Sequence, residues 1–141
     1  MTRRNVGSGY AFEDEYGYSR AVRAGHQVFV SGTTARGSAL EGDAYVQAKA
    51  ILSLIEAALA EAGAEMRDVV RSVVYVTDLA DQAQVARAHR EAFGRVRPAS
   101  TLVQVAALTP SAARVEMEVT AIVTEQDGTD PRPSGAAASS D

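Results

Sequence analysis

Two stretches near the N-terminus carry the apolar pattern of a β-hairpin. Residues 18–24 and 27–31 each suit an extended chain, and Gly25-His26 between them supplies a tight turn. The following segment, 32–42, contains three glycines among small polar residues and is expected to be a loop. The pattern therefore predicts two paired strands followed by a loop.

Apolar positions spaced for helices occur twice further along the chain. Asp43 is expected to cap a helix that runs to about Ala62, with Gly63 as its stop. The apolar face of this helix is formed by residues at spacings of three and four: Ala48, Leu52, Ile55, Leu59 and Ala62. A second helix is expected over 81–93, where Gly94 ends it. Both helices are predicted to pack on a sheet.

Three more stretches complete the predicted sheet. The strands expected here are 68–77, 101–105 and 114–123. The resulting order, ββαβαββ, is that of an α+β domain with both helices on one face of the sheet. Val, Met and Tyr alternate onto the other face, so self-association is expected to cover it.

The two ends of the chain lack this regular pattern. Residues 1–15 mix glycine, serine and charge and are expected to form an N-terminal arm or a short lead-in strand. The tail, 124–141, contains no large apolar residue, and such a segment cannot bury enough surface to offset its ordering entropy. The sequence therefore predicts one domain over 16–123 and a disordered tail.

Composition narrows the class of protein. A chain of 141 residues with 46% hydrophobic residues fits one globular domain. No apolar run approaches the roughly 18 residues of a membrane span, and no signal-peptide stretch follows the basic N-terminus, so a cytoplasmic location is expected. A net charge of −4, with Lys49 as the only lysine, argues against a nucleic-acid partner.

The residue types that bind metals are scarce. Cysteine is absent, which removes disulfides, thiol nucleophiles and thiolate ligands. His26 and His89 lie far apart in the sequence without ligand spacing around either, so no metal or other cofactor is expected. His26 is expected in a solvated turn and His89 on a helix face.

Short motifs are dispersed along most of the chain. In order they are Gly17-Tyr18-Ser19, Val30-Ser31-Gly32, Gly42-Asp43 with Gln47, Asp68-Val69-Val70, Val76-Thr77-Asp78, Phe93 before Pro98-Ala99, and Val115-Glu116-Met117-Glu118. Together they resemble the RidA/YjgF family of reactive-intermediate deaminases over roughly 17–123. The resemblance implies a chorismate-mutase-like fold and a homotrimer. It also implies three small-molecule clefts between subunits, each lined by two chains.

The resemblance also implies a set of catalytic residues. In the deaminating branch of the family, an Arg holds the substrate carboxylate while a Tyr, a strand-end Ser and a Glu position water against an imine carbon. An imine is already electrophilic, so positioning and proton relay can suffice without a cofactor. Matched position by position, Tyr18, Ser31 and Glu116 are the expected catalytic residues.

Two positions depart from that pattern. Ser100 stands where the deaminating branch has Arg after Pro-Ala, and Thr33 stands where Gln usually follows Ser-Gly. Losing a charge-assisted pair weakens binding by about 10- to 150-fold. Ser100, Thr101 and Thr33 are therefore expected to contact a ligand through neutral donors, and the substrate preference is expected to be altered.

Each of these residues also has a structural interpretation. Tyr18 could be a packed aromatic residue, Ser31 could favour a turn, and Glu116 and Glu118 share one face of a strand that could simply be solvated. With the family match, Glu116 is expected in the cleft, and Glu118 is expected to pair with an Arg of a neighbouring strand or subunit. The candidates to replace the missing guanidinium are Arg20, Arg23, Arg71, Arg97 and Arg114, each more often a surface or contact residue.

The sequence leaves several functions open. The first is a hydrolase of imines or enamines with an altered substrate preference. The second is a metabolite-binding or regulatory trimer without turnover, and another is a specialised-metabolism catalyst that uses the same cleft. Ribonuclease activity is disfavoured by the acidic charge and by the lack of a paired set of histidines.

Overall fold

The computed structural model describes residues 2–124, which form one mixed sheet with helices. The strands are β1 Arg3–Val6, β2 Ala21–Ala24, β3 Gln27–Thr34, β4 Val69–Val76, β5 Ala99–Gln104 and β6 Val115–Ile122. The helices are α1 Ala11–Tyr16, α2 Ala44–Glu61 and α3 Gln82–Phe93, and single 3-10 turns lie at Gly37–Glu41, Met66–Asp68 and Leu79–Asp81. The predicted ββαβαββ order is confirmed from β2 onward.

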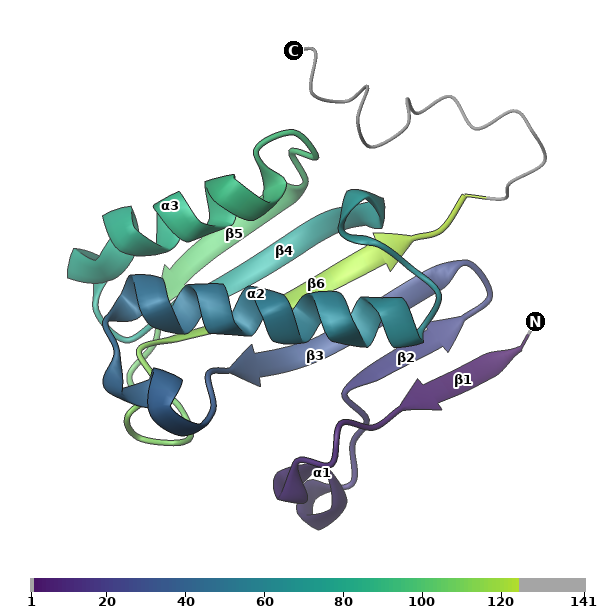
Figure 1. Ribbon diagram of the computed structural model, residues 1–141, viewed down its shortest axis with the longest axis horizontal. Helices are drawn as coiled ribbons and strands as arrows, with labels where there is room; N and C mark the ends of the chain where they lie inside the picture. The colour runs from purple at the N-terminus through teal and green to yellow at the C-terminus, as the bar shows by residue number, and fades with distance from the viewer. Residues whose placement is uncertain (1, 125–141) are drawn as a thin grey trace.

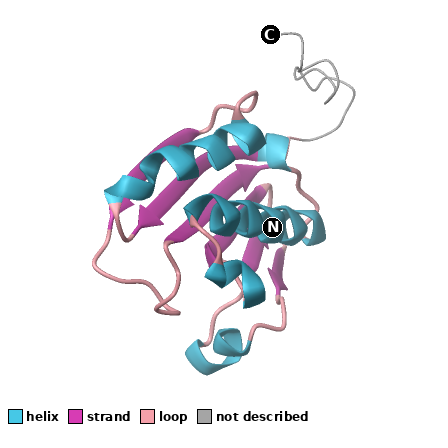
Figure 2. Ribbon diagram, turned by 60° about the vertical axis from the view of Figure 1, so that its left-hand side comes forward, coloured by secondary structure: helices cyan, strands magenta, loops and turns pink. Residues whose placement is uncertain are grey.

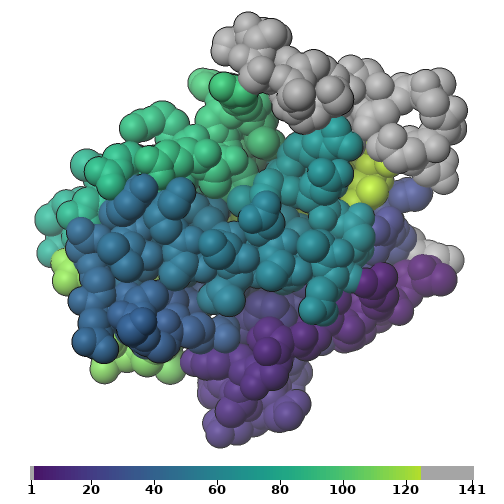
Figure 3. Space-filling model, in the orientation of Figure 1, coloured from purple at the N-terminus to yellow at the C-terminus, as the bar shows by residue number. Residues whose placement is uncertain are grey.

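The first residues form more structure than the sequence indicated. In the segment expected as an arm or lead-in strand, β1 pairs antiparallel with β2. The short helix α1 follows it and was not anticipated. In the space-filling view (Figure 3), this N-terminal segment, coloured purple, lies along one edge of the molecule beside α2. The predicted disordered tail lies outside the described residues, apart from Thr124.

The sheet has the strand order β1-β2-β3-β6-β4-β5, and both long helices, α2 and α3, cover one of its faces (Figures 1 and 2). Strands β4 and β5 are parallel, whereas the other neighbouring pairs are antiparallel. The last strand, β6, lies between β3 and β4. It therefore joins the N-terminal hairpin to the second half of the domain.

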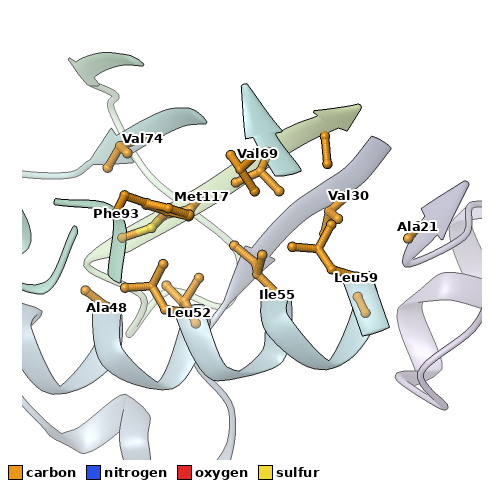
Figure 4. Packing of buried hydrophobic residues seen from close by; sticks show 14 of the residues in the cluster. Ala21, Val30, Ala48, Leu52, Ile55, Leu59, Val69, Val74, Phe93 and Met117 are labelled. Carbon is orange, nitrogen blue, oxygen red and sulfur yellow. The ribbon is translucent and has the colours of Figure 1, made fainter. Parts of the chain in front are cut away.

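The core lies between the sheet and α2. Met117 in β6 is fully buried on the helix side, and the predicted apolar stripe of α2 points toward the sheet, with Leu52 near Met117 and Leu59 near Val30 (Figure 4). Complete burial of such a side chain stabilises the fold by about 1.5–3 kcal/mol. The predicted cap of α2 is present, because Asp43 Oδ1 accepts a hydrogen bond from the backbone N–H of Val46 at 2.9 Å.

Neither long helix, α2 or α3, covers the other face of the sheet (Figures 1 and 2). The alternation of β6 places Glu116 and Glu118 on this face, opposite to the buried Met117. Phe29 and Val103 are exposed by 44% and 40%. The predicted self-association would cover these exposed apolar side chains with a second copy of the chain.

A β-bulge interrupts β3 where it meets β6. Val30 pairs with Val119 and Thr33 with Met117, so β3 carries one extra residue, within Ser31-Gly32, relative to its partner. A bulge of this kind re-aims side chains and bends the strand locally. The predicted strand-end serine therefore lies at an irregular point of the sheet.

No helix among residues 2–124 is long and apolar enough to cross a membrane.

Candidate functional site

A hollow of about 540 Å³ lies where the bulge of β3, the strand β6 and the helix α1 meet. It is lined by Tyr10, Phe12, Tyr16, Tyr18, Arg20, Ser31, Gly32, Thr34, Arg36, Ala107, Leu108, Thr109, Glu116 and Glu118. All three residues expected to be catalytic are in this set, although they come from distant parts of the sequence. The single chain therefore brings Tyr18, Ser31 and Glu116 to one concave surface.

Helix α1 builds the aromatic wall of the hollow. It ends at Gly17, whose φ of 88° is a left-handed conformation that glycine adopts without strain. The turn brings Tyr18 back against the helix, where its ring meets those of Phe12 at 6.1 Å and Tyr16 at 5.8 Å, both edge-on. Phe12 and Tyr16 stack with centroids 5.5 Å apart. This cluster gives the hollow an apolar side that sequence reasoning missed.

Arg20 holds the polar side of the hollow together and is only 3% exposed. Its Nη1 donates to the carbonyl oxygen of Gly32 at 2.7 Å and to Thr33 Oγ1 at 2.9 Å. Its Nη2 donates to the hydroxyl oxygen of Tyr18 at 2.7 Å. One guanidinium therefore fixes the phenol and the bulge relative to each other.

The charge of Arg20 is balanced by a buried carboxylate. Arg20 Nε lies 3.2 Å from Glu13 Oε2 in α1, where Glu13 is 6% exposed. Burial alone would raise the pKa of Glu13, but hydrogen bonds from the backbone and side chain of Ser8, together with Arg20, hold that pKa below its ordinary value. The pair anchors α1 to the sheet, so the aromatic wall depends on it.

The hydrogen bonds that Tyr18 and Ser31 make within the protein leave one donor and one acceptor available to a ligand. Since Tyr18 already accepts from Arg20, its own hydroxyl proton is free to point into the hollow. Ser31 Oγ donates to the backbone carbonyl of Ser19 at 2.7 Å, which leaves its lone pairs as acceptors. Tyr18 can therefore donate to a ligand, and Ser31 can accept from one.

Glu116 lies directly against the bulge. A Cβ atom at Gly32 would stand only 2.6 Å from Glu116 Oε2, so the approach of this carboxylate requires glycine there. Within residues 2–124 no hydrogen bond reaches Glu116. Burial, with the nearby charge of Glu118, raises the pKa of Glu116, and Arg20 opposes that rise. A half-buried carboxyl with a raised pKa is suited to both taking and returning a proton.

Glu118 finds a partner within the same chain, and the partner is not an arginine. Tyr75 in β4 donates its hydroxyl proton to Glu118 Oε1 at 2.7 Å. This hydrogen bond, followed by burial, raises the pKa of Tyr75. Within residues 2–124 no arginine pairs with Glu118, because the cross-strand neighbour that reaches the carboxylate is a tyrosine.

Two residues expected to bind ligand take other positions. Thr33 is completely buried, where it accepts from Arg20 and donates to the carbonyl of Ser31 at 2.9 Å. It therefore supports the hollow from behind and does not line it. Thr101 is exposed on β5 opposite Val73 and lines no part of the hollow within this chain.

Ser100 lies in a second hollow, of about 550 Å³, between α3 and β5. Ser72 Oγ donates to Ser100 Oγ at 2.7 Å, and His89 Nε2 lies 2.8 Å from Ser72 Oγ. Burial lowers the pKa of His89, which favours the neutral ring. His89 is thus part of a hydrogen-bonded chain that runs from the half-buried imidazole through the buried Ser72 to the exposed Ser100, a role that its helix position alone did not reveal.

The arginines considered as replacements for the missing guanidinium lie in different parts of the structure. Arg20 alone among them lines the first hollow, whereas Arg97 lines the second. Arg23 donates to the backbone carbonyl of Ala62, the residue that ends α2, and Arg114 pairs with Asp81 at 3.1 Å. Sequence reasoning also missed Arg36, which lines the first hollow.

No group of three or more His, Cys, Asp or Glu residues within the described part of the chain is placed to hold a metal ion. The chemistry available in the first hollow is that of hydroxyl, carboxyl and guanidinium groups. Such a set can bind a small polar molecule, and the carboxyl of Glu116 can exchange a proton with it.

Comparison with known proteins gives a consistent result. The family model described as Endoribonuclease L-PSP matches residues 9–123. An uncharacterized protein of Streptomyces coelicolor is 41% identical over 84% of this chain and 90% of its own length. A goat (Capra hircus) 2-iminobutanoate/2-iminopropanoate deaminase is 33% identical over 74% of this chain and 79% of its own. The crystal structure of a YjgF family member from Mycobacterium tuberculosis is 44% identical, with a TM-score of 0.81 over 86% of this chain and all of that one.

Proposed function

Because the chain belongs to the RidA/YjgF family, we propose that it is a hydrolase of imines or enamines of the deaminase type, with a substrate preference of its own. The observation that carries the proposal is the convergence of Tyr18, Ser31 and Glu116 on one hollow. The deaminase relatives, at about one-third identity, make the reaction class plausible.

The proposed reaction consumes one water molecule and releases ammonia. Glu116 takes a proton from water as the oxygen attacks the imine carbon and passes that proton to the imine nitrogen, which gives a neutral carbinolamine. Glu116 then takes the proton of the carbinolamine hydroxyl and delivers it to the amino nitrogen, so that the C–N bond breaks, ammonia leaves and the carbonyl forms. Tyr18 donates to the substrate and Ser31 accepts from the attacking water or the nitrogen, so both fix the reacting atoms.

A second copy of the chain completes the site in this proposal. The hollow with Ser100 opens beside β5, which is an edge strand of the sheet, and the face opposite α2 and α3 exposes Phe29 and Val103. In a homotrimer, the neighbour's Ser100 would face the first hollow and donate its hydroxyl proton to the ligand. The expected measurement is a trimer mass by light scattering. A stable monomer would remove Ser100 from the site.

The test of the reaction is ammonia release from 2-iminobutanoate generated in situ, compared with buffer. Replacing Glu116 by Gln or Tyr18 by Phe should lower the rate by about 10²-fold or more, because general acid–base catalysis contributes that much. Tyr45→Phe is the matched control, since the Tyr45 hydroxyl bonds only to the exposed Glu91. No acceleration by the wild-type protein over buffer would refute the proposal.

The Ser100→Arg variant tests the altered preference. It restores the guanidinium that the family resemblance places after Pro-Ala, and it should raise the rate with 2-imino acids if Tyr18 and Glu116 are correctly placed. An unchanged rate, in a folded trimer, would show that Ser100 does not face the substrate.

Binding without turnover is the second candidate function, and the same hollow supports it. Ligand-dependent chemical shifts at Tyr18 and Ser31, together with no ammonia release from any imine tested, would favour it.

A further inference from the structure

We propose that Arg36 is the anion receptor of the first hollow and binds a carboxylate of the substrate. This inference deepens the proposed function and rests on it, since it names the residue that recognises the substrate carboxylate in a chain that has Ser100 after Pro-Ala. It also assigns the role to the same subunit that supplies Tyr18 and Glu116, and not to the position of Ser100.

The first observation is the way Arg36 is held. It follows the end of β3, and its guanidinium carbon lies 3.6 Å from the centroid of the Tyr10 ring, which precedes α1. A guanidinium that lies over an aromatic ring is held there by its flat face. Its N–H groups point outward at its edge and remain available to bind a ligand. Arg36 and Tyr10 both line the hollow, so the stack forms part of its wall.

The second observation is that the guanidinium lacks an acceptor. Within residues 2–124, no carboxylate, carbonyl or hydroxyl accepts a hydrogen bond from Arg36, and its Nε is buried without a partner. Arg20, next to it, makes four such bonds. A half-buried, unpaired charge destabilises the empty protein, and an anion that reaches the hollow relieves this cost.

The surrounding charges favour an anion at the same place. Burial, followed by the charge of Arg20, lowers the pKa of Arg36, which remains cationic at neutral pH. Arg20 is paired with Glu13, so the guanidinium of Arg36 is the positive charge without a carboxylate partner in this part of the hollow. The planar fork of Arg36 offers two parallel donors that match the two oxygens of a carboxylate.

The opposite charge lines another part of the same hollow. The charges of Glu118 and Arg20 act on the pKa of Glu116, and the charges of Arg20 and Glu13 act on the pKa of Arg36. Arg20 is thus the charge that the two groups share. A ligand with a carboxylate at Arg36 and a basic nitrogen towards Glu116 complements both, which is the charge pattern of a 2-imino acid.

The test uses binding alone, so it does not depend on turnover. 2-Oxobutanoate, the expected carbonyl product, and its neutral amide, 2-oxobutanamide, are titrated into the wild-type protein and followed by NMR. Arg36→Met should weaken binding of the acid by about 10- to 150-fold and leave the amide unchanged. Arg36→Lys should fall between the two, because an ammonium keeps the charge but not the parallel donors.

Arg87→Met is the matched control. Its guanidinium carbon also lies 3.6 Å from an aromatic centroid, that of Tyr45, but it lies outside the hollow. This variant should bind both ligands as the wild type does. If Arg36→Met does not fold, the Lys variant carries the test through its selective loss of the acid.

The outcomes separate this inference from the proposed reaction. Acid-selective loss at Arg36 in a protein that releases no ammonia would uphold the receptor and refute the hydrolase. The receptor role would be refuted if the protein releases ammonia but Arg36→Met binds the acid as tightly as the wild type does. It would also be refuted if the wild type does not bind the acid more tightly than the amide.

Discussion

Replacing Gly32 by Ala should lower catalysis without unfolding the protein. An added Cβ would lie 2.6 Å from Glu116 Oε2 and 3.1 Å from Glu116 Cδ. Cβ contacts below 3.0 Å essentially do not occur, so the carboxylate must retreat by about 0.4–0.8 Å to reach the tight but possible range of 3.0–3.4 Å. A misplacement of about 1 Å can cost about 10²-fold in rate, so we expect kcat/KM to fall by roughly 10- to 100-fold.

Stability should change little in this variant. Gly32 does not have a positive φ, so alanine adopts its backbone conformation without strain. The atom that the new methyl displaces is at the far end of a flexible side chain, and the loss of glycine reduces the freedom of the unfolded chain. Thermal denaturation should therefore give a Tm close to that of the wild type.

Ammonia release measured at several substrate concentrations gives kcat/KM for the variant. Gly7→Ala is the control, because its Cβ would meet Glu13 Oε1 at an ordinary 3.7 Å. The Gly32→Ala change is then repeated in a Glu116→Ala background, where it should have no further effect. A loss of the same size in both backgrounds, or activity within twofold of wild type in the single variant, would refute the reasoning.

Three further predictions follow from charged groups. Glu13→Gln should lower the free energy of unfolding, measured in urea, by about 3–5 kcal/mol, because Arg20 is left buried without its carboxylate; an unchanged midpoint would contradict this. Burial lowers the pKa of His89, so the unfolded chain binds more protons and stability should fall as pH drops below about 6.5, a dependence that His89→Gln should flatten. The acid limb of kcat/KM should lie above the ordinary pKa of 4.5 because Glu116 is buried near Glu118, and Glu118→Gln should move that limb to lower pH.

The regular elements were predictable because their signals are local. Asp43 caps α2 and the spacing of its apolar residues marks the buried face, both of which are properties of adjacent positions. Helix α1 has no such signal, since six residues cannot form a stable helix alone. It depends on the ion pair between Glu13 and Arg20, whose partners belong to different elements.

The candidate site was predictable only through the family resemblance. Residue chemistry alone left Tyr18 and Glu116 open between a structural and a catalytic role, and their common hollow depends on the β3–β6 register. The bulge at Ser31-Gly32 is set by pairing with a strand near the other end of the sequence. The link from His89 to Ser100 through Ser72 joins three elements, so no short window of sequence contains it.

The place of β6 has a consequence for synthesis on the ribosome. The hairpin of β2 and β3 has no contact partner in the second half of the sheet until β6 arrives, and the acid of the hollow belongs to β6 itself. A nascent chain that has not yet released this strand from the exit tunnel holds two unjoined half-sheets. Neither a premature stop before Val115 nor an N-terminal fragment can therefore assemble the hollow, and the protein acquires its chemistry only once β6 has been translated.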